Sequence, residues 1–433
     1  MAIQKNAVPR IPLPPKLGQA QAYVTADEAA RSLGIKVATL YAYVSRGIVR
    51  SIAEPGRRRR LYYREDVERA ARRMGGRAGM PETVEAVLSW GQPVIQTALT
   101  DLTAMGPVYR GRSAIGLAEA GRSFESVAEL LWTGMDLPQL AAWQVGPAPE
   151  QLAQRLAASA RSPEALSGPR LIALTTSVIT VWTPRAPDFE RGTTVSDARE
   201  LIVLYAGALG LMGKPGRFLA PPSAGWPVAE LLLRALTGTT SREAVRALNY
   251  ALVLCADHEL SSATLSARVA ASCAADLRAC ILAAVATHSG KFFAGGCDDA
   301  EALLRTARGA DEMHAVMAGI ERSGARIPGY NMKAYPKGDP RARKLLELAA
   351  RLGGKSERIL EVVSGVETRF DLQPSLEVGL VALCVALDLP VGGAAAIWTL
   401  GRVAGWVAHV IEQRQAAFLM RPRARYVGPP PTY

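Results

Sequence analysis

The charge of this chain is distributed very unevenly. Its 433 residues carry a formal net charge of +12, and residues 1–80 hold 16 Lys or Arg against 6 Asp or Glu, a balance of +10. The remaining residues therefore contribute only +2. A basic segment joined to a nearly neutral body predicts two units with different partners, the first of them polyanionic.

The composition predicts a globular chain. Apolar residues make up 49% and charged residues 21% of the sequence, which argues against extensive disorder. The longest apolar runs, residues 201–212 and 378–387, fall short of the roughly 18 residues that a membrane-spanning helix needs. Residues 1–21 contain prolines where a signal peptide would have its apolar segment. We therefore expect a cytoplasmic protein without a membrane partner.

A helix-turn-helix pattern begins near residue 25. Thr25 and Glu28 form a capping box, in which each side chain satisfies a backbone amide at the start of a helix. Gly34 is placed to end this helix. Leu40 and Val44 belong to a second apolar stripe that follows a tight turn. Two short helices joined in this way predict a helix-turn-helix.

A basic turn follows the second helix. Pro55 and Gly56 lie between the apolar segments 48–52 and 61–63, which predicts a hairpin, or wing. Residues 64–67 then open another helix. With these features, residues 23–73 resemble the winged helix-turn-helix domains of the MerR and excisionase type.

This resemblance implies DNA binding, because in that family the second helix enters the major groove and the wing approaches the phosphates. It gives a DNA-facing role to these residues: Lys36, Thr39, Tyr41, Tyr43, Arg46, Arg57, Arg58, Arg59 and Arg60. The wing arginines are expected to contribute affinity and salt sensitivity more than sequence choice. The alternative is a protein-docking module whose four arginines form a solvated turn.

From about Pro93 onward the pattern is helical. Amphipathic runs are broken by Gly and Pro, and strand signals are confined to residues 94–108. The sequence holds no Walker loop, no G-x-S-x-G elbow and no histidine-pair metal motif. Its five cysteines form no C-x-x-C pair, so we expect reduced thiols and no metal site. These patterns alone predict an all-α domain without an identifiable reaction.

Several blocks of the helical region are similar to motifs of the citrate synthase family, in the same order. They are Val108 to Gly111 (VYRG), Phe124 to Trp132 (FESVAELLW), Ala256 to Leu260 (ADHEL), Ser262 to Arg268 (SATLSAR), Ile327 to Arg341 (IPGYNMKAYPKGDPR), Leu400 to Gln413 (LGRVAGWVAHVIEQ) and Arg421 to Tyr426 (RPRARY). The resemblance implies a mainly α fold that forms a dimer. Each subunit would have a large domain and a smaller domain that closes over substrate.

Together the two resemblances predict the domain boundaries. We expect a flexible tail over residues 1–21, a MerR-like winged helix-turn-helix domain over 22–74 and a linker over 75–92. The citrate synthase-like domain then covers residues 93–433, with its small subdomain at roughly 262–370. A glycine-rich stretch at residues 74–80 marks the junction.

Citrate synthases condense an acyl-CoA with oxaloacetate by means of a carboxylate base and two histidines. All three matching positions are altered here. Glu377 lies where the family has an aspartate and is the candidate base. Ala294 and Met332 lie where the family has its histidines, and neither side chain donates a hydrogen bond. The resemblance thus supplies the frame of the site but not two of its catalytic groups.

The groups that hold the carboxylates are retained. In the family oxaloacetate is bound by one histidine and three arginines, one of them from the partner subunit, and these match His258, Arg341, Arg402 and Arg421. An arginine binds a carboxylate bidentately and stays charged when buried. The alternative is that the arginines form structural ion pairs. Lys333 and Lys337 keep the adjacent loop positive and are the candidates for contact with CoA.

Three functions remain open. The favoured one is a catalytically degenerate regulator that binds DNA and a carboxylate such as oxaloacetate or citrate, as a homodimer without a cofactor. The second is an active citrate or methylcitrate synthase-type acyltransferase that takes an acyl-CoA substrate and uses Glu377, with backbone amides or Asp298 and Asp299 in other roles. The third is a structural partner that forms a heterodimer with a paralogous citrate synthase and supplies Arg421.

Overall fold

The computed structural model describes residues 23–45, 49–53, 59–64, 66–68, 95–138, 140–148, 151–159, 167–323, 327–422 and 428. The predicted tail and linker, together with Arg46, Arg57 and Arg58, lie outside these described residues. The chain separates into two compact units, Met1–Gln96 and Thr97–Tyr433. Each unit is described by itself.

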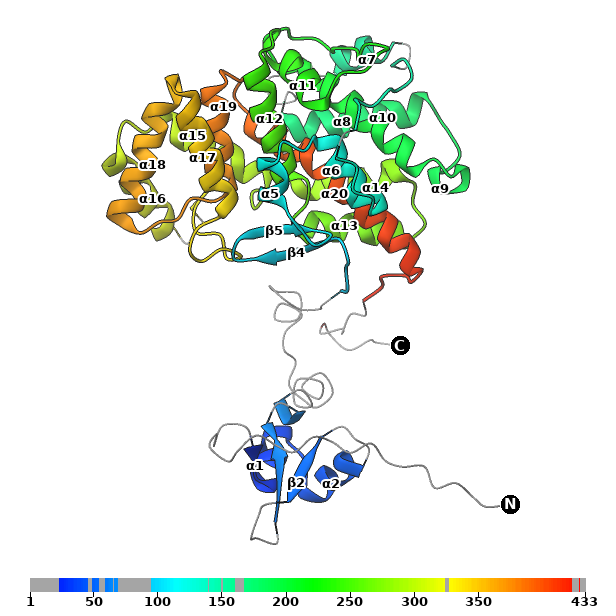
Figure 1. The fold of residues 1–433 in the computed structure, drawn as a ribbon, viewed down its shortest axis with the longest axis vertical. Coiled ribbons are helices and arrows are strands. Elements are labelled where there is room, and N and C mark those ends of the chain that lie inside the picture. The colour runs from blue at the N-terminus through cyan, green and yellow to red at the C-terminus, as the bar shows by residue number, and fades with distance from the viewer. Residues whose placement is uncertain are drawn as a thin grey trace. The chain divides into compact units, whose positions relative to one another are not determined.

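The N-terminal unit is a helix-turn-helix with a small antiparallel sheet of order β1-β3-β2 (Figure 1). Its elements are β1 (Tyr23–Val24), α1 (Ala26–Leu33), α2 (Val37–Ser45), β2 (Ser51–Ala53) and β3 (Arg60–Tyr63). The pairing of β2 with β3 confirms the predicted hairpin, and residues 64 and 66–68 are helical as expected. The sequence did not indicate β1, which pairs with β3.

The capping box of α1 is present. The backbone amide of Thr25 donates to Glu28 Oε2 over 2.8 Å, and the amide of Glu28 donates to Thr25 Oγ1 over 3.3 Å. Gly34 ends the helix in the left-handed region, at φ 62°. A carboxylate also fixes the start of the hairpin, because Asp66 accepts from the backbone amide and the guanidinium of Arg50.

The C-terminal unit begins with an antiparallel sheet of order β4-β5-β6. Its strands are β4 (Thr100–Thr103), β5 (Gly106–Tyr109) and β6 (Arg112–Ser113). Strands in this region agree with the strand signals of the sequence. Thr100 faces Tyr109 across the β4–β5 pair, which places the Tyr109 side chain at the buried end of the sheet.

The other regular elements of the described unit are helices, joined by loops. In chain order they are α5 (Ala114–Glu119), α6 (Phe124–Thr133), α7 (Leu152–Ser159), α8 (Gly168–Trp182), α9 (Asp188–Arg191), α10 (Thr194–Ala208), η2 (Leu209–Leu211), α11 (Val228–Thr237), α12 (Arg242–Cys255), α13 (Ser262–Ser272), α14 (Leu277–His288), α15 (Ala294–Thr306), α16 (Ala310–Arg322), α17 (Pro340–Leu352), η3 (Gly354–Ser356), α18 (Glu357–Phe370), α19 (Leu376–Ala386) and α20 (Gly393–Ala416).

Helix α20 is the centre of this unit. It packs against α6, α8, α10, α12, α13, α14, α15 and α19. Gly401 permits one of these contacts, because a Cβ atom there would lie 2.7 Å from Cys255 Cβ of α12. Helix α20 is long and apolar enough to cross a membrane by length and composition, yet 94% of its apolar window is buried inside the fold. It is thus a core helix.

Helices α15 to α19 form a lobe of their own, drawn in yellow and orange in Figure 1. Helix α16 packs on α18, while α15 and α17 pack on α19. Helices α13 and α14 pack on each other and on α20, which α15 and α19 of the lobe also contact. The predicted small subdomain at roughly 262–370 stays a prediction.

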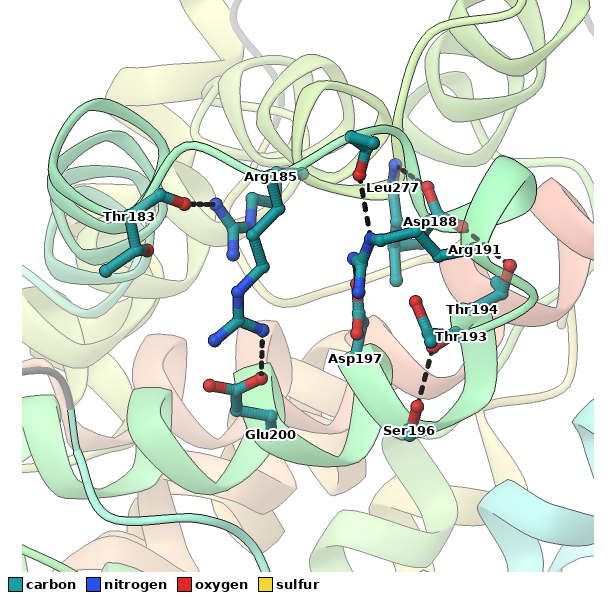
Figure 2. Close-up of polar contacts among 12 residues, drawn as sticks. Thr183, Arg185, Asp188, Arg191, Thr193, Thr194, Ser196, Asp197, Glu200 and Leu277 are labelled. Atoms are coloured by element: carbon teal, nitrogen blue, oxygen red, sulfur yellow. Dashed lines mark hydrogen bonds and ion pairs between the residues drawn. The ribbon is translucent and has the colours of Figure 1, made fainter.

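The buried carboxylate of Asp188 contacts three other segments near the C-terminal end of α20. Asp188 accepts from the Leu277 amide over 2.7 Å and from Thr194 Oγ1 over 2.6 Å (Figure 2). Its other contact is an ion pair of 2.7 Å with Arg414. Asp188 thereby connects α9, α10, α14 and α20. Burial alone would raise the pKa of this carboxyl group, but hydrogen bonds from Arg414 and Thr194 outweigh burial and lower it.

Candidate functional site

The loop from Ile327 to Asp339 is held against the start of α19. The Asn331 amide donates to Gln373 O over 2.8 Å, and the Ser375 amide donates to Gly329 O over 2.8 Å. Gly329 has φ 79°, and a Cβ atom there would lie 2.9 Å from Val378 Cγ2 and 3.1 Å from Ala300 Cβ. Only glycine fits this approach without strain. The loop therefore brings Met332 and α17 into one region with α15 and α19.

Arg341 is buried at the start of α17. Its side chain is 1% exposed and forms a two-point pair with Asp339, with Nε–Oδ1 of 3.0 Å and Nη2–Oδ2 of 2.7 Å. Burial opposes the charged form, but the Asp339 carboxylate outweighs it and raises the pKa of Arg341. The Nη1 atom of Arg341 is buried and has no hydrogen-bond partner among the described residues.

His258 lies in the same cluster. Its Nε2 is 3.0 Å from the hydroxyl oxygen of Tyr335, and the two rings meet edge to face with centroids 5.6 Å apart. The Arg341 guanidinium carbon lies 5.6 Å from the centre of the Tyr335 ring. Burial and then the charges of Arg341 and Arg402 hold the pKa of His258 well below its usual range. The imidazole is therefore neutral near pH 7 and can hydrogen-bond to a ligand without carrying charge.

Arg402 approaches the cluster from the middle of α20. It is 3% exposed, and its buried Nε has no partner within the described part of the chain. Burial lowers the pKa of Arg402, and Asp257 partly offsets this effect. The structure thus brings together His258, Arg341 and Arg402, three of the four predicted carboxylate-binding residues. A concentration of buried positive charge with free donor atoms is suited to an anion.

A series of buried side-chain hydrogen bonds lies next to His258 and begins at Asp257. Asp257 Oδ2 is 3.3 Å from His409 Nε2, and His409 Nδ1 is 3.2 Å from Arg268 Nη1. Arg268 also bonds Gln413 over 3.0 Å. The Tyr109 hydroxyl binds the backbone next to His258, 3.1 Å from Asp257 O. The turn that carries His258 is therefore fixed from α13, α20 and β5.

The three predicted catalytic positions lie on the loop, at the start of α15 and at the start of α19. Met332 Sδ is 4.0 Å from Arg341 Nη2, so the thioether lies next to the guanidinium group. Ala294 is the first residue of α15 and is fully buried. Glu377 is the second residue of α19, 5% exposed, and it contributes to a raised pKa of the buried Cys297 thiol, for which burial is the main cause.

The remaining predicted ligand residues are at the surface. Lys333 and Lys337 are exposed on the loop. Arg421 is exposed after the end of α20, and within the described part of the chain no hydrogen bond or ion pair joins it to His258, Arg341 or Arg402. A role for Arg421 in the site of a partner subunit stays a prediction.

A groove on the C-terminal unit lies elsewhere. It measures about 640 Å³ and is lined by residues of α9, α10 and α20, including Phe189, Arg199 and Arg414. Both arginines are already paired, Arg199 with Glu129 over 2.6 Å and Arg414 with Asp188. This groove is therefore not the candidate site for a carboxylate.

In the N-terminal unit, the candidate DNA-facing residues divide into three groups. Lys36, Thr39 and Tyr41 are exposed. Tyr43 is half-buried and packs on the small core of the unit. Arg59 and Arg60 are exposed on the β3 side of the hairpin, where Arg60 Nε bonds Ser51 Oγ over 3.0 Å.

Sequence reasoning did not single out four groups of the site: Tyr335, Asp339, Asp257 and Tyr109. Two signals were available, because Asp339 precedes Pro340 in the G-D-P-R motif and Asp257 precedes His258. Their partners became evident only from the fold, since Tyr109 and Asp257 are far apart in the chain.

Comparisons with known proteins identify two domains in the chain. A model of the citrate synthase C-terminal domain matches residues 88–423, and a helix-turn-helix domain model matches residues 23–75. Citrate synthase 2 of Bacillus subtilis is 29% identical over 371 residues, which cover 80% of this chain and 95% of that protein. The 2-methylcitrate synthase of Shewanella oneidensis is 28% identical over 193 residues, 43% of this chain and 51% of that protein.

Some curated relatives are matched over part of their length only. The alignment spans about half of a Mycobacterium tuberculosis relative, 52% of it at 31% identity, and 49% of the Haloferax volcanii citrate synthase at 30% identity. The first of these alignments covers 43% of this chain.

Solved structures show the same fold. The ternary complex of carboxymethyl coenzyme A and oxaloacetate with citrate synthase from Thermoplasma acidophilum has a TM-score of 0.71 at 21% identity, over 82% of this chain and 98% of that chain. Citrate synthase from Thermotoga maritima has a TM-score of 0.62 at 21% identity, over 79% and 96%. With the family match extending over residues 88–423, the chain belongs to the citrate synthase family and carries a helix-turn-helix domain at its N-terminus.

Proposed function

We propose that this protein is a carboxylate-binding regulator in which a citrate synthase-family domain of very low condensing activity is joined to a DNA-binding head. One observation carries the proposal. Arg341 and Arg402 are buried beside His258 with donor atoms that have no partner among the described residues. The positions of the two family histidines meanwhile hold Ala294 and Met332.

The buried arginines support ligand binding. A buried donor without a partner costs roughly 1–3 kcal/mol, and more when it is charged. A carboxylate in contact with Arg341 and Arg402 would remove that cost and gain charge-assisted hydrogen bonds. The Thermoplasma relative of the same fold is described in complex with oxaloacetate, which supports a dicarboxylate or tricarboxylate as the ligand class.

The missing histidines support loss of condensation. Each positioned hydrogen-bond donor at a developing oxyanion contributes on the order of 10² to 10³ in rate. Alanine has no donor, and a thioether is at best a weak acceptor. Binding through the arginines survives these changes, whereas polarisation of a thioester or ketone does not.

The second candidate is an active condensing enzyme of the citrate or methylcitrate type. Glu377 favours it, because this carboxylate is buried at the start of α19, next to the loop that carries Met332. Lys333 and Lys337 would then contact the acyl-CoA.

The test is calorimetric titration of the full chain with oxaloacetate and with citrate, followed by addition of acetyl-CoA and a free-thiol assay. We expect carboxylate binding without steady thiol release. Oxaloacetate-dependent thiol release that disappears in Glu377→Gln would establish the enzyme instead. Absence of carboxylate binding in the wild type would overturn both candidates.

DNA is the proposed partner of the N-terminal unit. The exposed side chains of Lys36, Thr39 and Tyr41 on and beside α2, with Arg59 and Arg60 on the hairpin, match a helix-and-wing surface. A ligand-induced change in the C-terminal unit that alters the spacing of two heads would couple carboxylate and DNA affinity. A fluorescence anisotropy titration of duplex DNA with and without citrate measures this coupling, and identical affinities would contradict it.

Two heads require two subunits, and we propose a homodimer. Helices α8, α13 and α14 pack side by side and expose apolar residues, with Val181 70%, Trp182 58% and Val269 38% exposed. A second copy placed on this face would bury them. The exposed Arg421 would be available to the partner subunit. A heterodimer with a paralogous citrate synthase is the alternative assembly, and a cytoplasmic location stays a prediction.

A further inference from the structure

His288 lies at the end of α14 and has no role in the family frame described above. Its side chain is 2% exposed and is surrounded by three aromatic rings. The ring centres are 4.9 Å from Trp398, 5.4 Å from Trp406 and 5.7 Å from Phe293. Both indoles meet the imidazole edge to face, at 85° and 75°. The imidazole is therefore held in one place between α14, α15 and α20.

Polar atoms in this aromatic cluster have no partners. Among the described residues, His288 Nε2, Trp398 Nε1, Trp406 Nε1 and Arg402 Nε are all buried without a hydrogen bond. Residues 398, 402 and 406 are four apart on α20, so their side chains lie on one face of the helix. His288 contacts Trp398 and Trp406, and Arg402 lies between these two residues on α20.

All four atoms can donate a hydrogen bond, His288 Nε2 in the tautomer that carries its proton there. Indole and guanidinium nitrogens only donate hydrogen bonds, and a neutral imidazole donates through one of its nitrogens. Asp257 influences Arg402 electrostatically, but no ion pair joins the two in the described part of the chain. A buried group of donors without an acceptor is suited to an anionic acceptor, of which a carboxylate is the simplest.

This cluster adjoins the candidate site at two points. Arg402 belongs to both groups. Phe293, which contacts His288, directly precedes Ala294, the position of a missing histidine. The His288 imidazole, at the end of α14, therefore lies close along the chain to Ala294 at the start of α15, where the family has a histidine.

We infer that His288 and Arg402 form a second anion-binding pair, which takes one carboxylate of a dicarboxylate or tricarboxylate ligand while Arg341 takes another. This inference rests on the proposed function, because it names the residue that completes ligand binding. His288 contributes a hydrogen bond through Nε2, and Trp398 and Trp406 fix the orientation of its ring.

The substitution His288→Phe separates this role from a packing role. Phenylalanine keeps the ring between the two indoles and removes Nε2. It also removes a buried polar atom without a partner, so the unfolding temperature is expected to stay equal or to rise. If the imidazole only fills space, ligand affinity will not change. If it binds the carboxylate, the Kd for citrate will increase about tenfold, as expected for loss of one hydrogen bond to a charged group.

The experiment is calorimetric titration of the full chain with citrate and with oxaloacetate, for the wild type, His288→Phe and His288→Gln. His314→Phe is the matched control, because His314 stacks on Phe370 with ring centres 3.5 Å apart, between α16 and α18, away from the arginines. We expect weaker binding in His288→Phe, partial retention in His288→Gln and wild-type affinity in His314→Phe.

An unchanged Kd in a folded His288→Phe would overturn the inference and leave the proposed function intact, provided that Arg341→Gln abolishes binding. A wild type that binds neither ligand would overturn the proposed function itself. Histidine-selective ¹⁵N NMR of the wild type gives an independent measurement. A His288 Nε2 resonance that moves on addition of citrate supports direct contact, and one that stays in place contradicts it.

Discussion

At the residue scale, two side chains of the candidate site, Arg341 and His258, are each oriented by an ion pair or a hydrogen bond to a neighbouring side chain. Asp339 neutralises Arg341 and fixes its orientation, while Tyr335 fixes His258. The Arg341–Asp339 pair leaves one donor of the arginine without a partner among the described residues. Arg341 keeps Nη1 available because Asp339 engages only Nε and Nη2.

The pair Arg341–Asp339 leads to a stability prediction. Asp339→Asn leaves a guanidinium 1% exposed without a counter-charge, and removal of one partner from a buried pair costs about 3–5 kcal/mol. Urea unfolding followed by circular dichroism should show a loss of this size. The control is Asp388→Asn, because Asp388 is exposed and pairs with the exposed Lys214 and Lys355. A loss no larger than in this control would show that Asp339 is dispensable.

His288 predicts a pH dependence of stability. Burial, followed by the charge of Arg402, lowers the pKa of His288 from 6.5 to about 3. Between these two values the unfolded chain binds more protons at His288 than the folded chain does. The contribution of His288 to the free energy of unfolding is therefore fully present above pH 6.5 and is lost progressively as the pH decreases toward 3. In His288→Phe this contribution is absent, and the unfolding free energy should fall less steeply over the same window. Parallel slopes in urea titrations from pH 7 to pH 4 would contradict the prediction.

At the element scale, short segments place the functional groups. Helix α20 carries Arg402 and His409 on buried faces, and its glycines let α12 approach closely enough to align His258. In the N-terminal unit, the capping box sets the start of α1, and the Asp66–Arg50 pair sets the start of the hairpin. These local devices fix the surface that we assign to DNA.

That surface predicts a salt dependence. Lys36→Ala and Arg60→Ala should each weaken binding to duplex DNA and lower the slope of log K against log salt by about 0.9, the value for one phosphate contact. Anisotropy titrations at several salt concentrations measure the slope. Lys355→Ala removes a charge from the C-terminal unit and serves as the control. Equal slopes in all variants would indicate that the N-terminal unit does not contact the phosphates.

At the scale of the whole molecule, the two units have separate cores. The N-terminal unit depends on a few residues such as Leu40, Val49 and Tyr62, whereas the C-terminal unit is organised around α20. The proposed function requires assembly at this scale, because a single chain has one helix-turn-helix domain and the exposed Arg421 is proposed to act in a partner subunit.

The exposed apolar residues of α8 and α13, which both pack on α14, lead to a prediction about the assembly. Val181→Asp combined with Val269→Asp places charge on this face and should convert a dimer to a monomer in sedimentation velocity, since burial of unpaired charge is costly. Val316→Asp is the control, because Val316 is also exposed, at 45%, but lies on α16. A dimer that persists in the double variant would place the interface on another face.

Much of the architecture could be predicted from the sequence. The capping box at Thr25, the stop at Gly34 and the basic turn define the helix-turn-helix, because capping and turn chemistry act over a few residues. The ordered family blocks predicted the citrate synthase fold, and the assignment of Ala294 and Met332 to altered catalytic positions stays a prediction. Strand β1 was missed because two residues carry too little periodicity to be recognised.

What the sequence determined by itself was the identity of the groups: a basic N-terminal helix-turn-helix unit, a citrate synthase-family unit, and the arginines, alanine and methionine at the positions that the resemblance assigns to the site. Only the tertiary structure decided which groups act together. The buried donors of Arg341 and Arg402, the Tyr335 hydroxyl on His258 and the position of His288 between Trp398 and Trp406 depend on side chains from α14, α17 and α20. Burial and unpaired hydrogen-bond donors are properties of packing between distant segments, and a linear pattern does not encode them locally.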